Sequence, residues 1–299
     1  MGANSHHDSP IFKLQLELLG EIFVLAKSST LRSRDNGTLK SEGGCGWLNV
    51  VGVCRTWQEI ALNTAQIWNR FDMPDIKHVE WALLLLARSK DVPLFVECAS
   101  PCKNTNVLCA IGPHLPRIQE LYLPARSSQI LSFFVAKGLR FLGLRPLDNA
   151  SSPVIEGVLK IDTPILSCLE LVRVDLPASI PCLPLLRRLY IGSMEGFCDM
   201  TVKSLLLFLR STPSLESLEI IHALRKPTAL SYPTVDLPKL SRISLTSKYF
   251  QTSLLFQHIR YPSSSAVGFI STDPPKASLN SLDSSLTLQA VTQLRRSTD

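Results

Sequence analysis

The sequence predicts an α+β chain in two parts, a small module of three helices followed by an irregular α/β solenoid with a parallel sheet. Two observations predict this arrangement. Near the N-terminus, apolar residues recur at spacings of three and four, which is typical of amphipathic helices. Further on, a six-residue template with apolar residues at its first, fourth and sixth positions returns every 20 to 29 residues, which is typical of a repeat protein.

Composition limits the class of protein. The chain has 299 residues, of which 45% are hydrophobic and 19% charged, so it can bury a substantial core. The net charge of +6 is not gathered into a run of Lys and Arg, and we therefore expect no nucleic-acid partner. The apolar run at 81–87 is too short to cross a bilayer, and the first residues lack an apolar signal core. We expect a soluble protein of the cytoplasm, the nucleus or both, with no membrane partner.

The first helix is predicted over 14–26, because apolar residues fall on one side of it and Glu17 and Glu21 on the other. Residues 1–10 are polar and are expected to be a disordered lead-in. Residues 27–46 are rich in Ser, Thr, Lys, Arg and Gly, and this composition predicts a flexible insertion.

Helical spacing resumes at Trp47 and continues to Ala61. Gly52 interrupts it, which predicts a break between two short helices. Cys54 stands beside Arg55, a neighbour that can activate a thiol, but its place on the apolar stripe predicts a core residue.

These segments resemble the F-box-like domain, a three-helix adaptor-binding module, in the form common in large families of fungal proteins. The matching residues are Leu14, Glu17-Leu18-Leu19, Glu21-Ile22-Phe23, Val53-Cys54-Arg55, Trp57, Ile60-Ala61, Thr64 and Ile67-Trp68. Gln15-Leu16 stands where the family usually has two prolines, and the 27–46 insertion is long.

The resemblance implies that residues 11–71 dock on the Skp-type adaptor of a cullin-RING ubiquitin ligase. The adaptor-binding residues it implies are Leu14, Leu16, Leu18, Ile22, Phe23, Val53, Cys54, Trp57 and Ile60. Residues 72–92 are then a connecting segment with a helix at 79–86, and a strand follows at 94–98.

Residues 93–271 are expected to form degenerate leucine-rich repeats, since the template spacing lies within the range of that class. The template occurs at Ile118, Leu121, Leu123; Leu139, Leu142, Leu144; Leu166, Leu169, Leu171; Leu186, Leu189, Ile191; Leu215, Leu218, Ile220; and Leu240, Ile243, Leu245. Prolines precede five of these segments and are expected to start the strands. The asparagine usual at the end of a regular leucine-rich strand is absent.

Between these strands the sequence predicts helices at 130–135 and 202–209, and a further strand at 266–270. Residues 272–299 are expected to form a disordered tail, with a loose helix at 286–294 as the alternative. Because side chains alternate along a strand, the positions between the template residues should form an exposed, concave face. We expect that face to bind a protein substrate through Glu120, Tyr122, Phe141, Glu170, Arg188, Tyr190, Glu219 and Arg242, with Gly143, Cys168, Ser217 and Ser244 beside them. The alternative is an ordinary solvated sheet face.

No catalytic motif stands out. The sequence lacks the phosphate-loop, dinucleotide-binding, serine-hydrolase and zinc-protease patterns. Its eight cysteines show no metal-ligand spacing and are expected to be buried, reduced thiols. We therefore expect no catalytic residue, metal or cofactor, and a protein that is not an enzyme.

The sequence thus predicts a substrate-recognition subunit of an SCF-type ubiquitin ligase, whose substrate it does not identify. The alternative is a non-catalytic leucine-rich-repeat scaffold or receptor in which the F-box-like helices only cap the solenoid.

Overall fold

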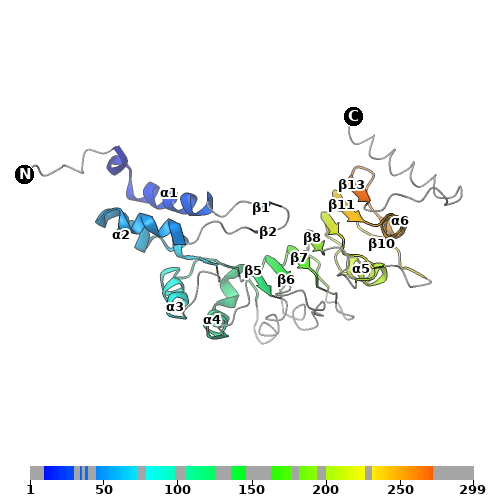
Figure 1. Cartoon of the computed structure of the whole chain (residues 1–299), viewed down its shortest axis with the longest axis horizontal. Helices are drawn as coiled ribbons and strands as arrows, with labels where there is room; N and C mark the ends of the chain where they lie inside the picture. Colours follow the sequence, from blue (N-terminus) through cyan, green and yellow to red (C-terminus); the bar gives the residue numbers. More distant parts are fainter. Residues whose placement is uncertain are drawn as a thin grey trace, which may run out of the picture. The chain divides into compact units, whose positions relative to one another are not determined.

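The computed structural model describes residues 10–29, 34–35, 38–39, 45–72, 79–97, 105–124, 136–145, 163–174, 176, 182–193, 200–225 and 231–271 (Figure 1). The chain divides into two compact units. The first comprises Met1–Val96 and Asn104–Ile111, and the second Glu97–Lys103 and Gly112–Asp299. Helices and a parallel sheet are both present, so the predicted α/β class is confirmed at that level.

The first described elements of the first unit are a short 3-10 helix, η2 (Pro10–Lys13), and helix α1 (Leu16–Ser29). The helix predicted for 14–26 is therefore present, shifted toward the C-terminus. Its inner side carries Leu19 and Phe23, both buried. Lys27, which we expected in a flexible insertion, is buried on the same side and donates a hydrogen bond to the carbonyl of Ile67.

The second helical segment consists of a 3-10 helix, η3 (Cys45–Gly52), followed by α2 (Arg55–Asn63). The predicted break after Gly52 is confirmed, although the part before it is a 3-10 helix. Cys54 is the N-cap of α2, because its sulfur accepts a hydrogen bond from the backbone N–H of Trp57 at 3.5 Å. The expectation that Cys54 belongs to the core is wrong, since this residue is half-buried and serves the helix end.

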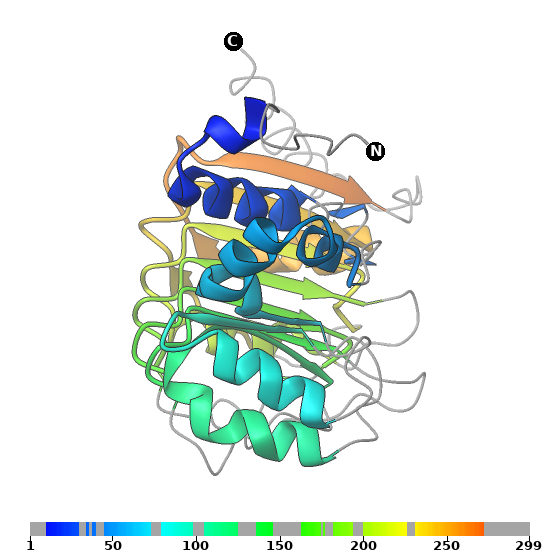
Figure 2. The ribbon, with the colours of Figure 1, turned by 90° about the vertical axis from the view of Figure 1, so that its left-hand side faces the viewer.

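Helices α1 and α2 pack through aromatic side chains, and they lie side by side in Figure 1 and Figure 2. The rings of Phe23 and Trp57 have centroids 4.9 Å apart. The 3-10 helix η4 (Ala65–Trp68) follows α2, and the indole N–H of Trp68 donates to the carbonyl of Ala61 at 2.7 Å.

Most of the predicted insertion at 27–46 lies outside the described residues. Its described part differs from a structureless loop, because α1 runs through Ser29 and two short strands follow it. These are β1 (Arg34–Asp35) and β2 (Thr38–Leu39), which pair antiparallel.

The remaining elements of the first unit are β3 (Arg70–Asp72), α3 (Val79–Arg88), β4 (Leu94–Glu97) and α4 (Thr105–Ile111). The helix predicted for 79–86 and the strand predicted for 94–98 are therefore found, whereas α4 was not predicted. The backbone N–H of Phe95 donates to the carbonyl of Asn69 at 3.0 Å.

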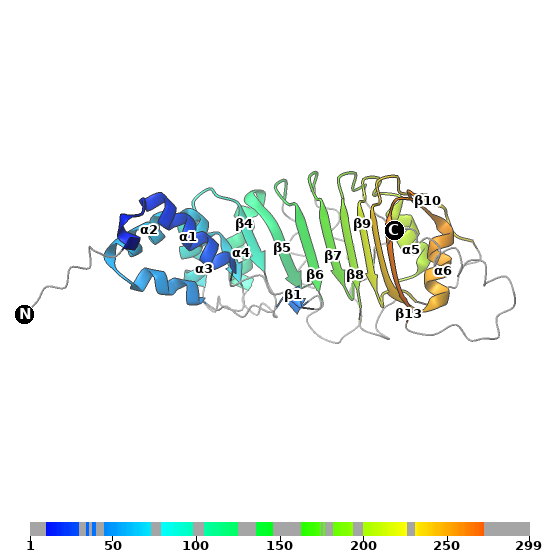
Figure 3. The same cartoon turned by 90° about the horizontal axis from the view of Figure 1, so that it is seen from above.

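Within its described residues, the second unit is built on a sheet of seven strands in which neighbouring strands are parallel (Figure 2, Figure 3). They are β5 (Ile118–Pro124), β6 (Phe141–Arg145), β7 (Cys168–Val172), β8 (Arg188–Gly192), β9 (Ser217–Ile221), β11 (Arg242–Ser247) and β13 (Ala266–Ser271). The strand predicted for 266–270 is thereby confirmed. A separate parallel pair joins β10 (Val235–Asp236) to β12 (Ile259–Arg260).

The second unit also contains η6 (Gly112–Arg117), α5 (Val202–Leu209) and α6 (Tyr249–His258). Helix α5 is found where the sequence predicts it, whereas α6 was not predicted. The helix predicted for 130–135 and the tail predicted for 272–299 lie outside the described residues. Helices α5 and α6 lie on the same side of the strands in Figure 1, and α5 supplies Leu205, Leu206 and Phe208 to the core.

The core of the second unit consists of rows of aliphatic side chains that cross the sheet in register. One row runs Leu121, Leu142, Leu169, Leu189, Leu218 and Ile243, and the next runs Leu123, Leu144, Leu171, Ile191, Ile220 and Leu245. Every residue of both rows is at most 3% exposed. The template residues are therefore core residues, as predicted.

Turns of one kind lead into five of the strands. In each, a leucine N–H donates to the carbonyl three residues earlier, at 3.0 to 3.2 Å, and the five leucines are Leu139, Leu166, Leu186, Leu215 and Leu240. Four of these turns have proline as their second residue, at Pro164, Pro184, Pro213 and Pro238. Pro116 instead lies inside η6.

The prediction that these prolines start the strands is wrong. Each strand begins four residues later, and the proline occupies the second position of a β-turn. Proline suits that position because its ring fixes φ near −65° and the turn needs no N–H there.

Within the described part of the chain, no helix combines the length and the apolar character needed to cross a membrane.

Candidate binding surfaces

The first unit exposes large apolar side chains on the outer side of α1. Leu18, Ile22 and Leu25 follow one another at i, i+4 and i+7, so they lie on one side of the helix. They are 44%, 43% and 67% exposed. We call these three residues the α1 stripe.

Three further apolar residues expected to bind an adaptor are also exposed, namely Leu14, Leu16 and Val53. Leu25 was not among the expected residues, although its spacing from Leu18 could have indicated it. Five of the nine expected adaptor-binding residues therefore reach the surface: Leu14, Leu16, Leu18, Ile22 and Val53.

The other four do not form a free surface. Phe23 and Ile60 are only 3% and 9% exposed. The expectation that they contact an adaptor directly is therefore corrected, because both are core residues. Trp57 and Cys54 are half-buried. Phe23 and Trp57 pack α1 against α2, and in this way they hold the α1 stripe in position.

The exposed face of the sheet in the second unit brings the predicted substrate-binding residues into two rows. The first row is Glu120, Phe141, Cys168, Arg188, Ser217, Arg242 and Ala266, and the second is Tyr122, Gly143, Glu170, Tyr190, Glu219, Ser244 and Gly268. Register thus places all eight predicted residues on one face.

An aromatic cluster lies where β5 meets β6. The rings of Tyr122 and Phe141 have centroids 4.4 Å apart, and the guanidinium of Arg145 lies 5.7 Å from the centroid of the Tyr122 ring. Tyr122 and Phe141 are buried, so the expectation that they form an open contact surface is corrected. The two rings pack against one another instead.

Arg145 belongs to this face and was missed by the sequence interpretation. It lies two residues beyond Gly143 on β6, on the same side of the sheet, and its guanidinium forms an ion pair with Glu170 at 2.7 Å. Continuing the strand alternation by two residues would have indicated it.

Tyr190 lies between Glu170 and Glu219 in the second row. Its side chain lies close to Gly192 of the same strand, because a Cβ atom at Gly192 would be 2.7 Å from the Tyr190 hydroxyl. Burial raises the pKa of Tyr190 above its ordinary value of 10.0, the carboxylates of Glu170 and Glu219 raise it further, and Arg145 opposes them. The hydroxyl therefore stays protonated at neutral pH and can donate or accept a hydrogen bond.

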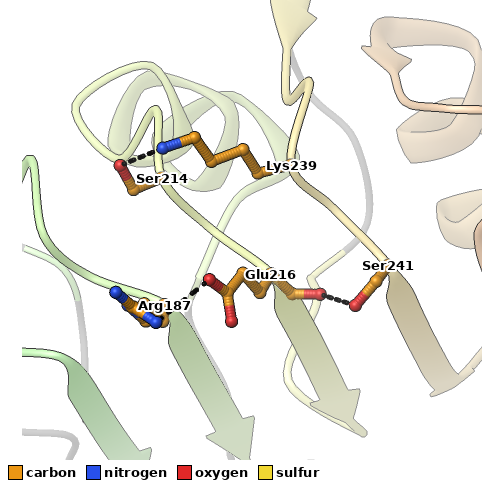
Figure 4. Close-up of polar contacts among 5 residues, drawn as sticks. All are labelled: Arg187, Ser214, Glu216, Lys239 and Ser241. Atoms are coloured by element: carbon orange, nitrogen blue, oxygen red, sulfur yellow. Dashed lines mark hydrogen bonds and ion pairs between the residues drawn. The ribbon is translucent and has the colours of Figure 1, made fainter.

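Polar side chains link neighbouring strands at the edge where the strands begin (Figure 4). Arg187 forms an ion pair with Glu216 at 3.5 Å, and the hydroxyl of Ser241 donates to the carbonyl of Glu216 at 2.9 Å. The amino group of Lys239 donates to the hydroxyl of Ser214 at 3.5 Å. Arg188 and Arg242 are exposed, and neither has an ion pair with another described residue.

The four cysteines that the structure describes give no sign of a metal site. Cys54, Cys109, Cys168 and Cys182 form no disulfide; Cys109 and Cys182 are exposed and the other two are half-buried, so the expectation that these four are buried is wrong. Across the described ranges, no group of three or more His, Cys, Asp or Glu residues could hold a metal ion.

Comparison with protein-family models, with curated proteins and with solved structures finds no match for this chain.

Proposed function

We propose that this chain is the substrate-recognition subunit of an SCF-type cullin-RING ubiquitin ligase. In this proposal the helical unit docks on a Skp-type adaptor, and the exposed sheet face of the second unit holds a protein substrate. The observation that carries the proposal is the α1 stripe, which lies on a module whose sequence resembles an F-box-like domain.

The physical case for docking rests on the apolar side chains left in water. Full burial of one Leu or Ile side chain contributes about 1.5 to 3 kcal/mol. Leu18, Ile22 and Leu25 have the i, i+4, i+7 spacing with which a helix inserts into an apolar groove. The resemblance supplies the identity of the partner, since F-box-like modules bind Skp-type adaptors.

For the second unit we propose a degenerate leucine-rich-repeat solenoid. Repeated turns of one kind, register-matched leucine rows and strands that follow chain order support that assignment. The exposed face then offers carboxylates, guanidinium groups and the half-buried phenol of Tyr190 to a protein, a mixture that suits protein recognition. We propose that the chain acts by binding alone and carries no catalytic group or cofactor.

The experiment is co-purification of the full-length chain with a Skp-type adaptor. We expect Leu18→Asp with Ile22→Asp, and separately Val53→Asp, to weaken adaptor binding by roughly tenfold or more, because each places a charge in an apolar contact. Leu207→Asp is the matched control, since Leu207 is an exposed leucine on a helix of the second unit. Phe23 and Ile60 are unsuitable positions because their replacement would disrupt the core.

Two outcomes would overturn the proposal: a wild-type chain that fails to bind adaptor, or stripe variants that bind as tightly as Leu207→Asp. Either would favour a scaffold whose helices only cap the repeats.

A further inference from the structure

Exposed cations gather at the edge where the strands of the second unit begin. They lie in the turns that lead into β6, β8 and β11 or at the starts of those strands, and all are exposed: Lys137, Arg140, Arg187, Arg188, Lys239 and Arg242. In the corresponding segments of the described strands, only Glu120 and Glu216 carry negative charge. We call these six cations the basic strip.

Part of the strip is already occupied by internal contacts. Arg187 is paired with Glu216, and Lys239 bonds to Ser214 (Figure 4). Arg188 and Arg242 have no such partner among the described residues, and they stand in one row with Ser217 between them. Since neighbouring strands are about 4.8 Å apart, the two guanidinium groups are anchored roughly 10 Å from each other.

The adjacent row has the opposite sign. Glu219 lies two residues beyond Ser217 on β9, about 7 Å along the strand, and no described cation forms an ion pair with it. Glu170 in the same row is neutralised by Arg145 at 2.7 Å. From β8 to β11, the free charges of the face are therefore Arg188 and Arg242 in the first row and Glu219 in the second, beside the Tyr190 ring, whereas Glu120 lies further along the first row, on β5.

Resting on the proposed function, we infer that the substrate segment bound here is an extended polypeptide with two acidic side chains and one basic side chain. The acidic side chains bind Arg188 and Arg242, and the basic side chain binds Glu219 next to Tyr190. A polypeptide can carry acidic and basic side chains about 7 Å from one another, and so can match both signs of charge on this face. A nucleic acid carries only negative charge along its backbone and would meet repulsion at Glu219.

The spacing of the two arginines limits the sequence of this segment. In an extended polyproline II conformation, residues i and i+3 lie on the same side of the chain about 9 Å apart. In a β conformation, residues i and i+2 are about 7 Å apart. The arginine spacing therefore favours two acidic residues separated by two others, as in Asp-x-x-Asp.

The test is binding of short fluorescein-labelled peptides to the full-length chain, measured by fluorescence anisotropy. One peptide carries Asp-x-x-Asp followed by Lys, the second has the same composition with adjacent aspartates, and the third has the charges reversed. A labelled single-stranded oligonucleotide is the fourth probe. We expect the first peptide to bind best, about tenfold more tightly than the third, with an affinity that falls as salt is raised.

Charge-reversal variants make the result specific. Arg188→Glu with Arg242→Glu should lose roughly tenfold in affinity for the Asp-x-x-Asp peptide and gain affinity for the charge-reversed peptide. Lys203→Glu is the control, because Lys203 is an exposed cation on α5 and does not belong to the strip. Glu219→Gln should weaken binding of the Asp-x-x-Asp peptide that carries the lysine and leave unchanged the binding of a further peptide in which Gln replaces that lysine.

The inference is overturned if the three peptides bind alike, if the double variant binds like Lys203→Glu, or if the oligonucleotide binds more tightly than every peptide. Adaptor co-purification of the same variants separates this inference from the proposed function. If the chain binds adaptor but does not discriminate between the peptides, only this inference is contradicted. If it discriminates between the peptides but does not bind adaptor, only the ligase assignment is contradicted.

Discussion

The ring of Tyr122 on β5 lies directly against Gly143 on β6. A Cβ atom added at Gly143 would be 2.4 Å from Cδ1 of Tyr122, a separation that real side chains do not tolerate. The Phe141 ring also packs against it, with centroids 4.4 Å apart, and the guanidinium of Arg145 lies 5.7 Å from its centroid. The absence of a side chain at position 143 therefore fixes the aromatic cluster that borders the charged rows.

Gly143→Ala should consequently destabilise the second unit. The methyl group would force the Tyr122 ring out of its place against Phe141, and overpacking of this kind costs about 1 to 3 kcal/mol. Urea unfolding monitored by circular dichroism measures this change. Gly268→Ala is the matched control, because Gly268 is in the same row on β13 and its added Cβ would approach nothing closer than 3.8 Å. Equal effects of the two substitutions would mean that the ring does not lie over Gly143.

The turns that lead into the strands allow a stabilising substitution. Lys137 is the second residue of the turn from Ala136 to Leu139, whose closing hydrogen bond is 3.0 Å, and four equivalent turns have proline at that position. Lys137→Pro should stabilise the chain by about 0.4 to 1 kcal/mol, because it restricts the unfolded chain and removes no hydrogen bond. The midpoint of urea unfolding is the measurement.

Gly138→Ala, one residue later, should have the opposite effect, because its Cβ would lie 2.4 Å from the carbonyl oxygen of Pro116. A loss of stability in Lys137→Pro would contradict the assignment of this turn to the same kind as the other four.

The leucine rows could be predicted from the sequence because two patterns agree, namely the two-residue alternation within a strand and the recurrence of the template from strand to strand. Alternation within a strand sends Leu169 and Leu171 to one face, and the template repeats that choice in each strand. The prolines were wrongly predicted to start the strands. The sequence indicates that a strand follows each proline, but it does not give the number of turn residues between the two.

The helical surface was harder to predict for a physical reason. Leu19 and Phe23 satisfy the i, i+4 spacing of a helix face as well as Leu18 and Ile22 do, so spacing alone cannot say which stripe is buried. Packing against α2 decides the question, because Phe23 meets Trp57 there. Alternation from Gly143 indicates the side of the sheet on which Arg145 lies, but not its ion pair with Glu170, which lies 25 residues further along the chain.

The ionisation of Tyr190 tests the second row of the sheet face. Its pKa is raised by burial and then by Glu170 and Glu219, so the phenol should ionise at higher pH than an ordinary tyrosine, whose pKa is 10.0. Glu219→Gln removes one negative charge and should lower the pKa of Tyr190. The measurement is the ultraviolet absorbance of phenolate as a function of pH, with Tyr190→Phe subtracted to isolate this residue.

The same shift makes a contribution to stability that depends on pH. Because the folded chain holds the phenol proton more tightly than the unfolded chain, the contribution is fully present below pH 10.0 and is lost as the pH rises through the pKa of the folded state. Tyr190→Phe should therefore reduce the fall in unfolding free energy above that pH, whereas Glu59→Gln, an exposed control in α2, should leave it unchanged. If the pKa of Tyr190 is unchanged in Glu219→Gln, the two side chains are not neighbours in the row.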